Sequence, residues 1–287
     1  MALLDKAASK FRRDGKWWLL MSRFLHDFKR FFNYTVYSSK AELKSEVADS
    51  FLSWLWWFLD PLLYMLVYSF IAVVVFKSNV QYFPVFVFLG LNTWTFFQKT
   101  VKSSVKLVSG KKMIVTKVYI PKYMFIFEKI GVYGFKMIVS NLLVVVTMIG
   151  YHVPLTWRVV WVIPITIVLV VVTFGFSTIM LHFGVFVEDL LNVITVVLQL
   201  GFYLSGIFYS IESIGKNIVG RVPAPYGDLL VKLNPLALII TDLRRVLLYQ
   251  EDPHWVMLSV WFVIGLILSF IGVKIVYKFE NSYVKVI

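Results

Sequence analysis

The sequence predicts an all-α, polytopic membrane protein with six transmembrane helices. The 287 residues are 59% hydrophobic and have a mean hydropathy of +0.78, whereas soluble domains are about half apolar. Long runs, such as 159–187, contain no Asp, Glu, Lys or Arg. These runs reach the roughly 20 residues that an α-helix needs to cross the hydrocarbon core.

An N-terminal arm, residues 1–50, precedes the predicted membrane domain, residues 51–287. Between Trp17 and Phe31, apolar residues recur at helical spacing and charged residues occupy the other faces. This pattern predicts an amphipathic helix in the membrane interface. A helix packed on a protein surface is the alternative.

The expected spans are 51–76, 82–98, 130–151, 159–182, 190–210 and 253–273. Asp60, directly before Pro61, interrupts the first span. A carboxylate in a span usually faces protein or a water-filled cavity, so Asp60 either lines a path or pairs with a cation. Alternatively, the span begins near Leu59, and Asp60 caps it with Pro61 at the first helical position.

The segment 211–253 is too long for a simple turn and only mildly polar. Val222–Pro225 marks a break, and Asn234-Pro235 then interrupts an apolar stretch that is too short to cross a membrane. We expect short re-entrant or interfacial helices before the last span, with their backbone buried in protein. Arg244 and Arg245 then either meet a phosphate or face lipid headgroups.

Lysine and arginine counts predict the orientation. With six spans both termini share a side. The arm carries ten Lys/Arg, residues 99–129 carry eight and the tail from Lys274 carries three, against seven on the opposite side. We therefore expect both termini and the lysine-rich segment in the cytoplasm.

The stretch from Lys99 to Lys122 holds seven lysines and no acid. Apolar residues alternate with lysines from Val108 to Tyr123, and Pro121 disfavours helix at its end. A short cytoplasmic helix of this kind can dock on a partner, or the lysines only enforce topology. A phosphate-binding loop is excluded, because the glycine and Ser/Thr spacing of that motif is missing around Gly110.

Other function classes find little support. The chain has no cysteine, which excludes disulfides and thiolate metal sites. The net charge of +13 is explained by topology and anionic lipid, not nucleic acid. His182, Glu188 and Asp189 favour a polar turn over a metal site, so we expect no metal.

The ordered segments of the chain resemble the permease subunits of type-2 ABC exporters, especially those that export lipid-linked polysaccharides such as teichoic acid, O-antigen and capsule. The resembling segments are the Trp-then-Pro span 50–70, the Gly- and Trp-containing span 82–97, Ile120-Pro121-Lys122 after the basic loop, and the Asn-Pro segment 233–248 with its arginines. Leu52-Ser53 replaces a glycine that many members carry before the first-span tryptophan.

The resemblance implies a non-catalytic half-transporter in a bacterial plasma membrane. Two copies form the path for a lipid-linked glycan, and two separate ATPase subunits hold ATP and Mg²⁺, so this chain binds no cofactor. The residues expected to couple to the ATPase are Gly110, Lys111, Lys112, Met113, Lys117 and Pro121. The residues expected at the outer gate are Asn234, Pro235, Arg244 and Arg245.

Aromatic residues in the spans can stack on sugar rings, although packing or lipid contact is the alternative. The expected path residues are Asp60, Tyr64, Tyr68, Tyr203, Phe208 and Tyr209. Export of a drug or small metabolite is a second hypothesis. A membrane-embedded transferase is a third, although only the 182–189 cluster offers the acid–base groups it needs. No charge ring or polar pore helix supports a channel.

Overall fold

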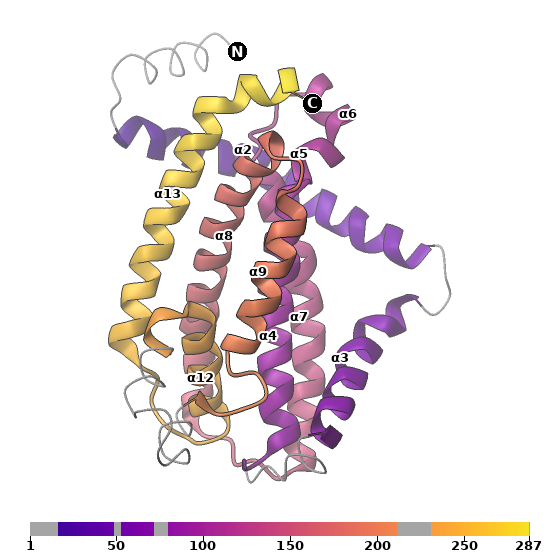
Figure 1. Ribbon diagram of the computed structural model, residues 1–287, viewed down its shortest axis with the longest axis vertical. Coiled ribbons are helices and arrows are strands. Elements are labelled where there is room, and N and C mark those ends of the chain that lie inside the picture. The colour runs from indigo at the N-terminus through magenta and orange to yellow at the C-terminus, as the bar shows by residue number, and fades with distance from the viewer. Residues whose placement is uncertain (1–16, 49–52, 72–79, 212–230, 287) are drawn as a thin grey trace.

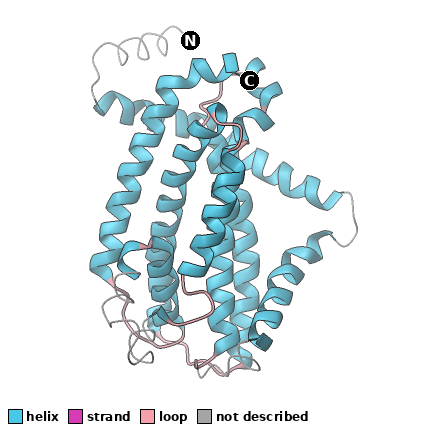
Figure 2. Cartoon of the chain, viewed as in Figure 1, coloured by secondary structure: helices cyan, strands magenta, loops and turns pink. Residues whose placement is uncertain are grey.

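The computed structural model describes residues 17–48, 53–71, 80–211 and 231–286. These residues form helices and connecting loops, with no strand among them (Figure 2). The helices are α2 (Trp17–Ala48), α3 (Ser53–Phe70), α4 (Phe83–Val105), α5 (Leu107–Gly110), α6 (Lys112–Lys117), α7 (Met124–Gly150), η2 (Trp157–Trp161), α8 (Val162–Phe186), α9 (Leu190–Leu204), α12 (Pro235–Leu247) and α13 (Trp255–Val286).

Helices α4, α7, α8, α9 and α13 run along one axis as a bundle, and α3 lies beside α4 and α7 (Figure 1). Helix α2 lies across one end of the bundle, where α5, α6 and the end of α13 also gather. We call this the α6 end. Helix α12 lies at the opposite end, which we call the α12 end.

Three helical segments are long and apolar enough to cross a membrane. They are Met124–Gly150, Trp157–Phe186 and Trp255–Val286. Their apolar residues are only partly covered by protein, as expected for helices that face lipid. The prediction of an all-helical chain with several membrane-crossing helices is confirmed in the described residues.

Several helices extend beyond the predicted spans or stop short of them. Helix α13 continues from 273 to Val286, because Tyr277 and Tyr283 pack into a second apolar cluster at the α6 end. Helix α4 continues past 98 to Val105, and its Thr100 and Ser104 hydroxyls bond to carbonyls one turn earlier. Helix α9 stops at Leu204 instead of 210, because the chain turns at Gly206 with φ +65°.

The first span is described only from Ser53 to Phe70 as α3, so both expected ends, 51 and 76, lie outside the described residues. Helix α3 begins seven residues before Asp60 and continues past Pro61. Asp60 is therefore not a helix cap, and that alternative is wrong. Arm residues 1–16 and the break at Val222–Pro225 also lie outside the description.

Glycines bring α8 and α13 close together. A Cβ on Gly175 would lie 3.0 Å from the carbonyl oxygen of Gly265, and one on Gly272 would lie 2.1 Å from the Thr178 hydroxyl. Membrane helices commonly associate through small residues, because lipid offers no hydrophobic drive for helix pairing. These contacts make α8 and α13 a close-packed pair.

One apolar side of α2 packs on protein. The ring centroids of Phe24 and Tyr123 are 5.3 Å apart, and those of Phe28 and Phe127 are 5.1 Å apart. For this side of α2, the predicted alternative of a helix packed on a protein surface therefore holds. Leu25 and Phe32 remain exposed, so another side of the same helix is available to lipid.

Arg244 of α12 joins three parts of the chain. Its guanidinium donates to the carbonyl oxygens of Phe86 (3.0 and 3.1 Å), Gly206 (2.7 Å) and Ile207 (2.9 Å). Its central carbon lies 3.3 Å from the centroid of the Phe86 ring. Only 3% of Arg244 is exposed, so its donors are used inside the protein and do not face a phosphate or a lipid headgroup.

Replacing Arg244 with glutamine is expected to destabilise the fold by several kcal/mol, about 1–3 kcal/mol for each buried carbonyl that loses its hydrogen-bond donor. Arg245→Gln is the matched control, since Arg245 contacts Glu251 at 3.1 Å at the partly exposed surface and should cost about 1 kcal/mol or less. Denaturant unfolding in detergent measures both. Equal losses at the two adjacent arginines would contradict the assignment.

Candidate functional site

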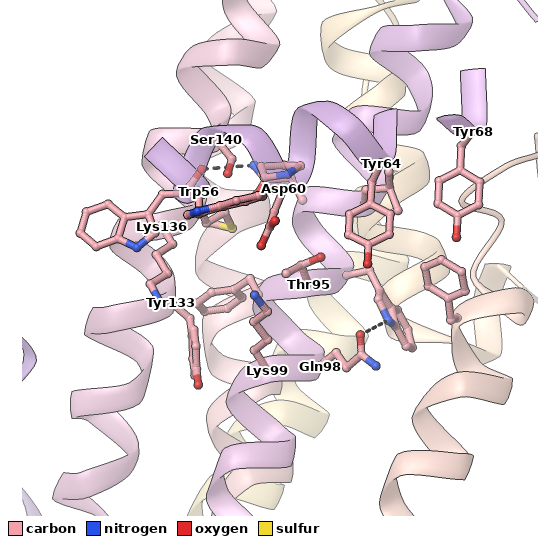
Figure 3. Close-up of a pocket in the computed structure, with 18 of the residues that line it drawn as sticks. Trp56, Asp60, Tyr64, Tyr68, Thr95, Gln98, Lys99, Tyr133, Lys136 and Ser140 are labelled. Atoms are coloured by element: carbon pink, nitrogen blue, oxygen red, sulfur yellow. Dashed lines mark hydrogen bonds between the residues drawn. The ribbon is translucent and has the colours of Figure 1, made fainter. Parts of the chain in front are cut away.

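A cavity of about 790 Å³ lies between α2, α3, α4, α7 and α9. Four of the six expected path residues line it, namely Asp60, Tyr64, Tyr68 and Tyr203. Figure 3 shows Asp60 and Tyr64 projecting from α3 toward Thr95 and Lys99 of α4. The structure thus brings together residues that are far apart in the sequence.

The other two expected path residues lie next to the cavity. The ring centroids of Phe208 and Tyr68 are 4.3 Å apart. The Tyr209 hydroxyl donates to the Tyr203 carbonyl oxygen at 2.6 Å. Phe208 and Tyr209 therefore support the cavity wall without lining it.

Aromatic rings make up much of the cavity wall. They come from four helices and are Trp56, Trp57, Tyr64, Tyr68, Trp94, Phe96, Tyr133, Phe202 and Tyr203. Polar side chains are placed among them. They are Glu46, Asp60, Asn92, Thr95, Gln98, Lys99, Lys136, Ser140 and Gln199. Flat apolar faces interrupted by hydrogen-bonding groups suit a ligand that is itself part apolar and part hydroxylated, such as a sugar.

Some of these polar groups are held in position by neighbours. The Asn92 amide donates to the Asn141 side-chain oxygen at 2.6 Å, and Gln98 accepts from the Trp94 indole at 3.1 Å. Lys136 of α7 pairs with Glu46 of α2 at 2.6 Å and lies 5.8 Å from the Trp57 ring. A cation over an aromatic face is stabilised by the ring quadrupole.

Sequence reasoning missed Glu46, Lys99 and Lys136 as cavity residues. Lys136 stood out as a lone charge inside a predicted span, which is a signal of an internal site. Glu46 and Lys99 gave no such signal, because both read as charges at the ends of membrane segments. Only the folded arrangement places them on one cavity.

A second candidate region is the surface around α6. Met113 is 78% exposed, and Ile114, Val118 and Tyr119 are also exposed. Gly110, Lys112 and Lys117 are exposed beside them. We call these residues, Gly110, Lys112–Ile114 and Lys117–Tyr119, the docking segment. It presents apolar side chains bordered by cations.

Two expected coupling residues do not belong to this surface. The ammonium of Lys111 turns inward to Glu128 of α7, which is only 1% exposed. Pro121 is buried. Both residues hold the segment to the bundle and are not presented to a partner, because a buried carboxylate needs its cation.

Burial shifts the pKa of Tyr119 in the docking segment and of Lys122, three residues later. Desolvation, followed by the nearby Glu280 carboxylate, raises the pKa of Tyr119 to about 12. Its phenol therefore stays a proton donor at neutral pH. Desolvation lowers the pKa of Lys122, and Glu280 partly opposes this effect.

The α12 end contains the other expected gate residues. Asn234 caps α12, because its side-chain oxygen accepts from the backbone amides of Leu236 (3.0 Å) and Ala237 (3.3 Å). Pro235 occupies the first turn, where its missing amide hydrogen costs nothing. Asn234 also donates to the Ser205 hydroxyl at 3.0 Å, which ties the cap to the end of α9.

Across the described ranges, no three His, Asp or Glu side chains gather as a metal site. The His182 ring nitrogen lies 2.9 Å from the Tyr283 hydroxyl on α13. Glu188 and Asp189 lie in the turn between α8 and α9. This trio forms a polar connection at the α6 end.

The chain was compared with known proteins. Residues 35–248 match the family model described as ABC-2 type transporter. The O-antigen export system permease protein RfbA of Myxococcus xanthus is 27% identical over 74% of this chain and 79% of its own length. The protein of the same name from Klebsiella pneumoniae is 24% identical over 89% of this chain and 95% of its own length.

The family match covers most of the chain, including α4, α7, α8, α9 and α12. The predicted resemblance to a type-2 ABC exporter permease is therefore confirmed. So is the expectation of a non-catalytic transmembrane subunit, since permeases of this family pair with a separate ATPase subunit. The chain belongs to the ABC-2 type transporter family and is a multi-pass membrane permease.

Proposed function

We propose that this chain is the permease subunit of an ATP-driven exporter that moves a lipid-linked polysaccharide out of a bacterial cell. The observation that carries this substrate class is the cavity wall, in which tryptophan and tyrosine rings alternate with amide, hydroxyl and carboxylate groups. The names of the O-antigen export relatives agree with it.

The proposed membrane arrangement has six crossings. The crossings would be α7, α8 and α13 together with α3, α4 and α9, which lie alongside them (Figure 1). The lysine-rich segment and the described ends of the chain gather at the α6 end, so the positive-inside rule favours the α6 end as cytoplasmic. The protein then resides in the plasma membrane with both termini inside.

The ATPase is proposed to dock on the exposed docking segment. Apolar side chains at its centre and lysines at its border match the usual arrangement of a protein interface. Two copies of this chain would form the path and two ATPase subunits would bind ATP and Mg²⁺. Asn234, Pro235 and the neighbouring α12 surface would border the exit.

Assembly is tested by native mass spectrometry of the complex extracted from its own membrane. We expect two copies of this 33.4 kDa chain with two ATPase chains. The triple variant Lys112→Glu, Met113→Glu, Lys117→Glu should weaken ATPase binding at least ~10-fold, because it removes an apolar anchor and reverses two rim charges.

The matched control reverses Lys40 and Lys44, which are exposed on α2 outside the docking segment. It should retain the ATPase. A lone monomer with no ATPase under any mild condition would refute the exporter assignment and favour a transferase. Equal loss in the control would show that overall positive charge, and not the docking segment, holds the ATPase.

The substrate class is tested with the paired tryptophans of α3. Trp56 lines the cavity, whereas Trp54, two residues earlier and similarly exposed, does not. In proteoliposomes with the ATPase, a synthetic polyprenyl-phosphate-linked oligosaccharide should stimulate ATP hydrolysis. Trp56→Ala should reduce that stimulation about 10-fold, the size of one lost stacking contact, and Trp54→Ala should not.

Basal hydrolysis without substrate is measured for both variants, and it should not change. A small hydrophobic dye serves as the alternative substrate. Stimulation by the dye and not by the oligosaccharide would replace glycan export with export of small molecules. Equal effects of the two tryptophan variants would remove the cavity from the path.

A further inference from the structure

The position of α6 is not set by its own packing. Among Lys112–Lys117, only Val115 is buried. A helix of six residues with one buried side chain has little independent stability. The contacts at its two ends must therefore hold it. At the first end, Lys111 pairs with Glu128 of α7, and its ammonium lies 5.0 Å from the Phe125 ring.

The second end is held by residues from two other helices. Arg23 of α2 donates to the Tyr119 hydroxyl at 2.7 Å and to Glu280 of α13 at 3.1 Å. The Tyr119 hydroxyl donates to the other Glu280 oxygen at 3.2 Å. Three segments that are distant in sequence thus meet at one triangle of hydrogen bonds.

A deeper layer continues this triangle into the protein. The Tyr277 hydroxyl donates to Asp27 at 2.7 Å and lies 2.8 Å from the Tyr123 hydroxyl. The Arg23 guanidinium lies 4.0 Å from the Tyr277 ring centroid. Asp27, Tyr123 and Tyr277 are buried, where hydrogen bonds are strengthened by the low local dielectric. We call Arg23, Asp27, Tyr119, Tyr123, Tyr277 and Glu280 the tyrosine–carboxylate cluster.

Helix α2 connects this cluster to the cavity. Residues Arg23 to Glu46 lie in one uninterrupted helix, and the length of this stretch corresponds to about 35 Å. Glu46 lines the cavity and pairs with Lys136 of α7. Between Arg23 and Glu46, the Ser39 hydroxyl donates to the Glu128 carbonyl oxygen at 3.0 Å. One rigid element therefore contacts both the docking segment's anchor and the cavity wall.

We propose that the tyrosine–carboxylate cluster fixes α6, α2 and the end of α13 as one moving unit, so that α2 carries a movement of the docking segment to the cavity at Glu46. This inference rests on the proposed function, because it assumes an ATPase that moves α6. The cluster residues are positioning residues and touch neither ATP nor the transported molecule. Loss of the Arg23–Glu280 pair, which lies outside the docking segment, should leave the ATPase bound but separate its motion from α2.

The natural absence of cysteine permits clean spin labelling. One pair of labels, at Thr116→Cys on α6 and Tyr37→Cys on α2, tests rigidity. A second pair, at Tyr37→Cys and Val196→Cys on α9, tests movement against the bundle. All three positions are exposed, and none belongs to the docking segment. Labelled chains are diluted with unlabelled ones, and distances are measured by electron paramagnetic resonance in the full complex with its ATPase, with and without a non-hydrolysable ATP analogue.

We expect the 116–37 distance to change by no more than about 2 Å on nucleotide binding, while the 37–196 distance changes by more. In Glu280→Gln, and more strongly in Arg23→Glu, the 116–37 distance should broaden or shift by about a helical turn, ~5 Å. The double reversal Arg23→Glu with Glu280→Arg should restore the narrow distribution. Lys29→Glu, on an exposed position of α2, is the control and should change nothing.

A nucleotide-dependent change of the 116–37 distance in the native sequence would overturn the proposal. So would a fixed 37–196 distance, or single variants that keep both distances native. Co-purification separates this result from the proposed function. If the native chain binds no ATPase, the exporter assignment fails, whereas a bound ATPase with unaltered distances in the variants refutes only the moving unit.

Discussion

The buried guanidinium of Arg244 is the interaction on which the α12 end depends. Helix α9 ends at Leu204, and the following turn leaves the Gly206 and Ile207 carbonyl oxygens inside the protein, where they need hydrogen-bond donors. Interrupted backbone at membrane depth is tolerated only where protein satisfies it. Arg244 does so from α12. The position of the Arg244 side chain also requires a glycine at Gly90, since a Cβ there would lie 2.7 Å from a guanidinium nitrogen.

The two ends of the bundle are therefore built differently. At the α12 end one cation is surrounded by carbonyls and an aromatic ring, with none of its donors exposed. At the α6 end, tyrosine hydroxyls and carboxylates share several partners among α2, α13 and the residues after α6. These hydrogen bonds join the elements of the proposed moving unit to one another, so the unit can shift as a whole. Arg244 instead ties α12 to the bundle helix α4. The geometry therefore favours movement at the α6 end and a fixed frame at the other.

Sequence patterns predicted the features that depend on local composition. They missed the features that depend on contacts between residues distant in the sequence. Long apolar runs located α7 and α8, because length and hydropathy alone decide a crossing. The end of α13 was missed, since its charges at Lys274 and Lys278 read as a tail, although Tyr277 and Tyr283 bury the other side of the same helix. Arg244 and Arg245 are adjacent and chemically identical, so no local pattern could show that one is buried and the other is not.

The cavity residues also divide into those that the sequence predicted and those that it missed. Tyr64, Tyr68 and Tyr203 were found as aromatics on predicted spans, whereas Glu46, Lys99 and Lys136 became part of the site only when α2, α4 and α7 met. With Asp60, these charges number two of each sign, so they give the cavity no excess of positive charge to concentrate a free anion. Under the proposed function, ring faces and hydrogen-bond positions would then select the sugar. Because one of the four charges belongs to α2, a shift of that helix would alter the cavity and the docking segment together.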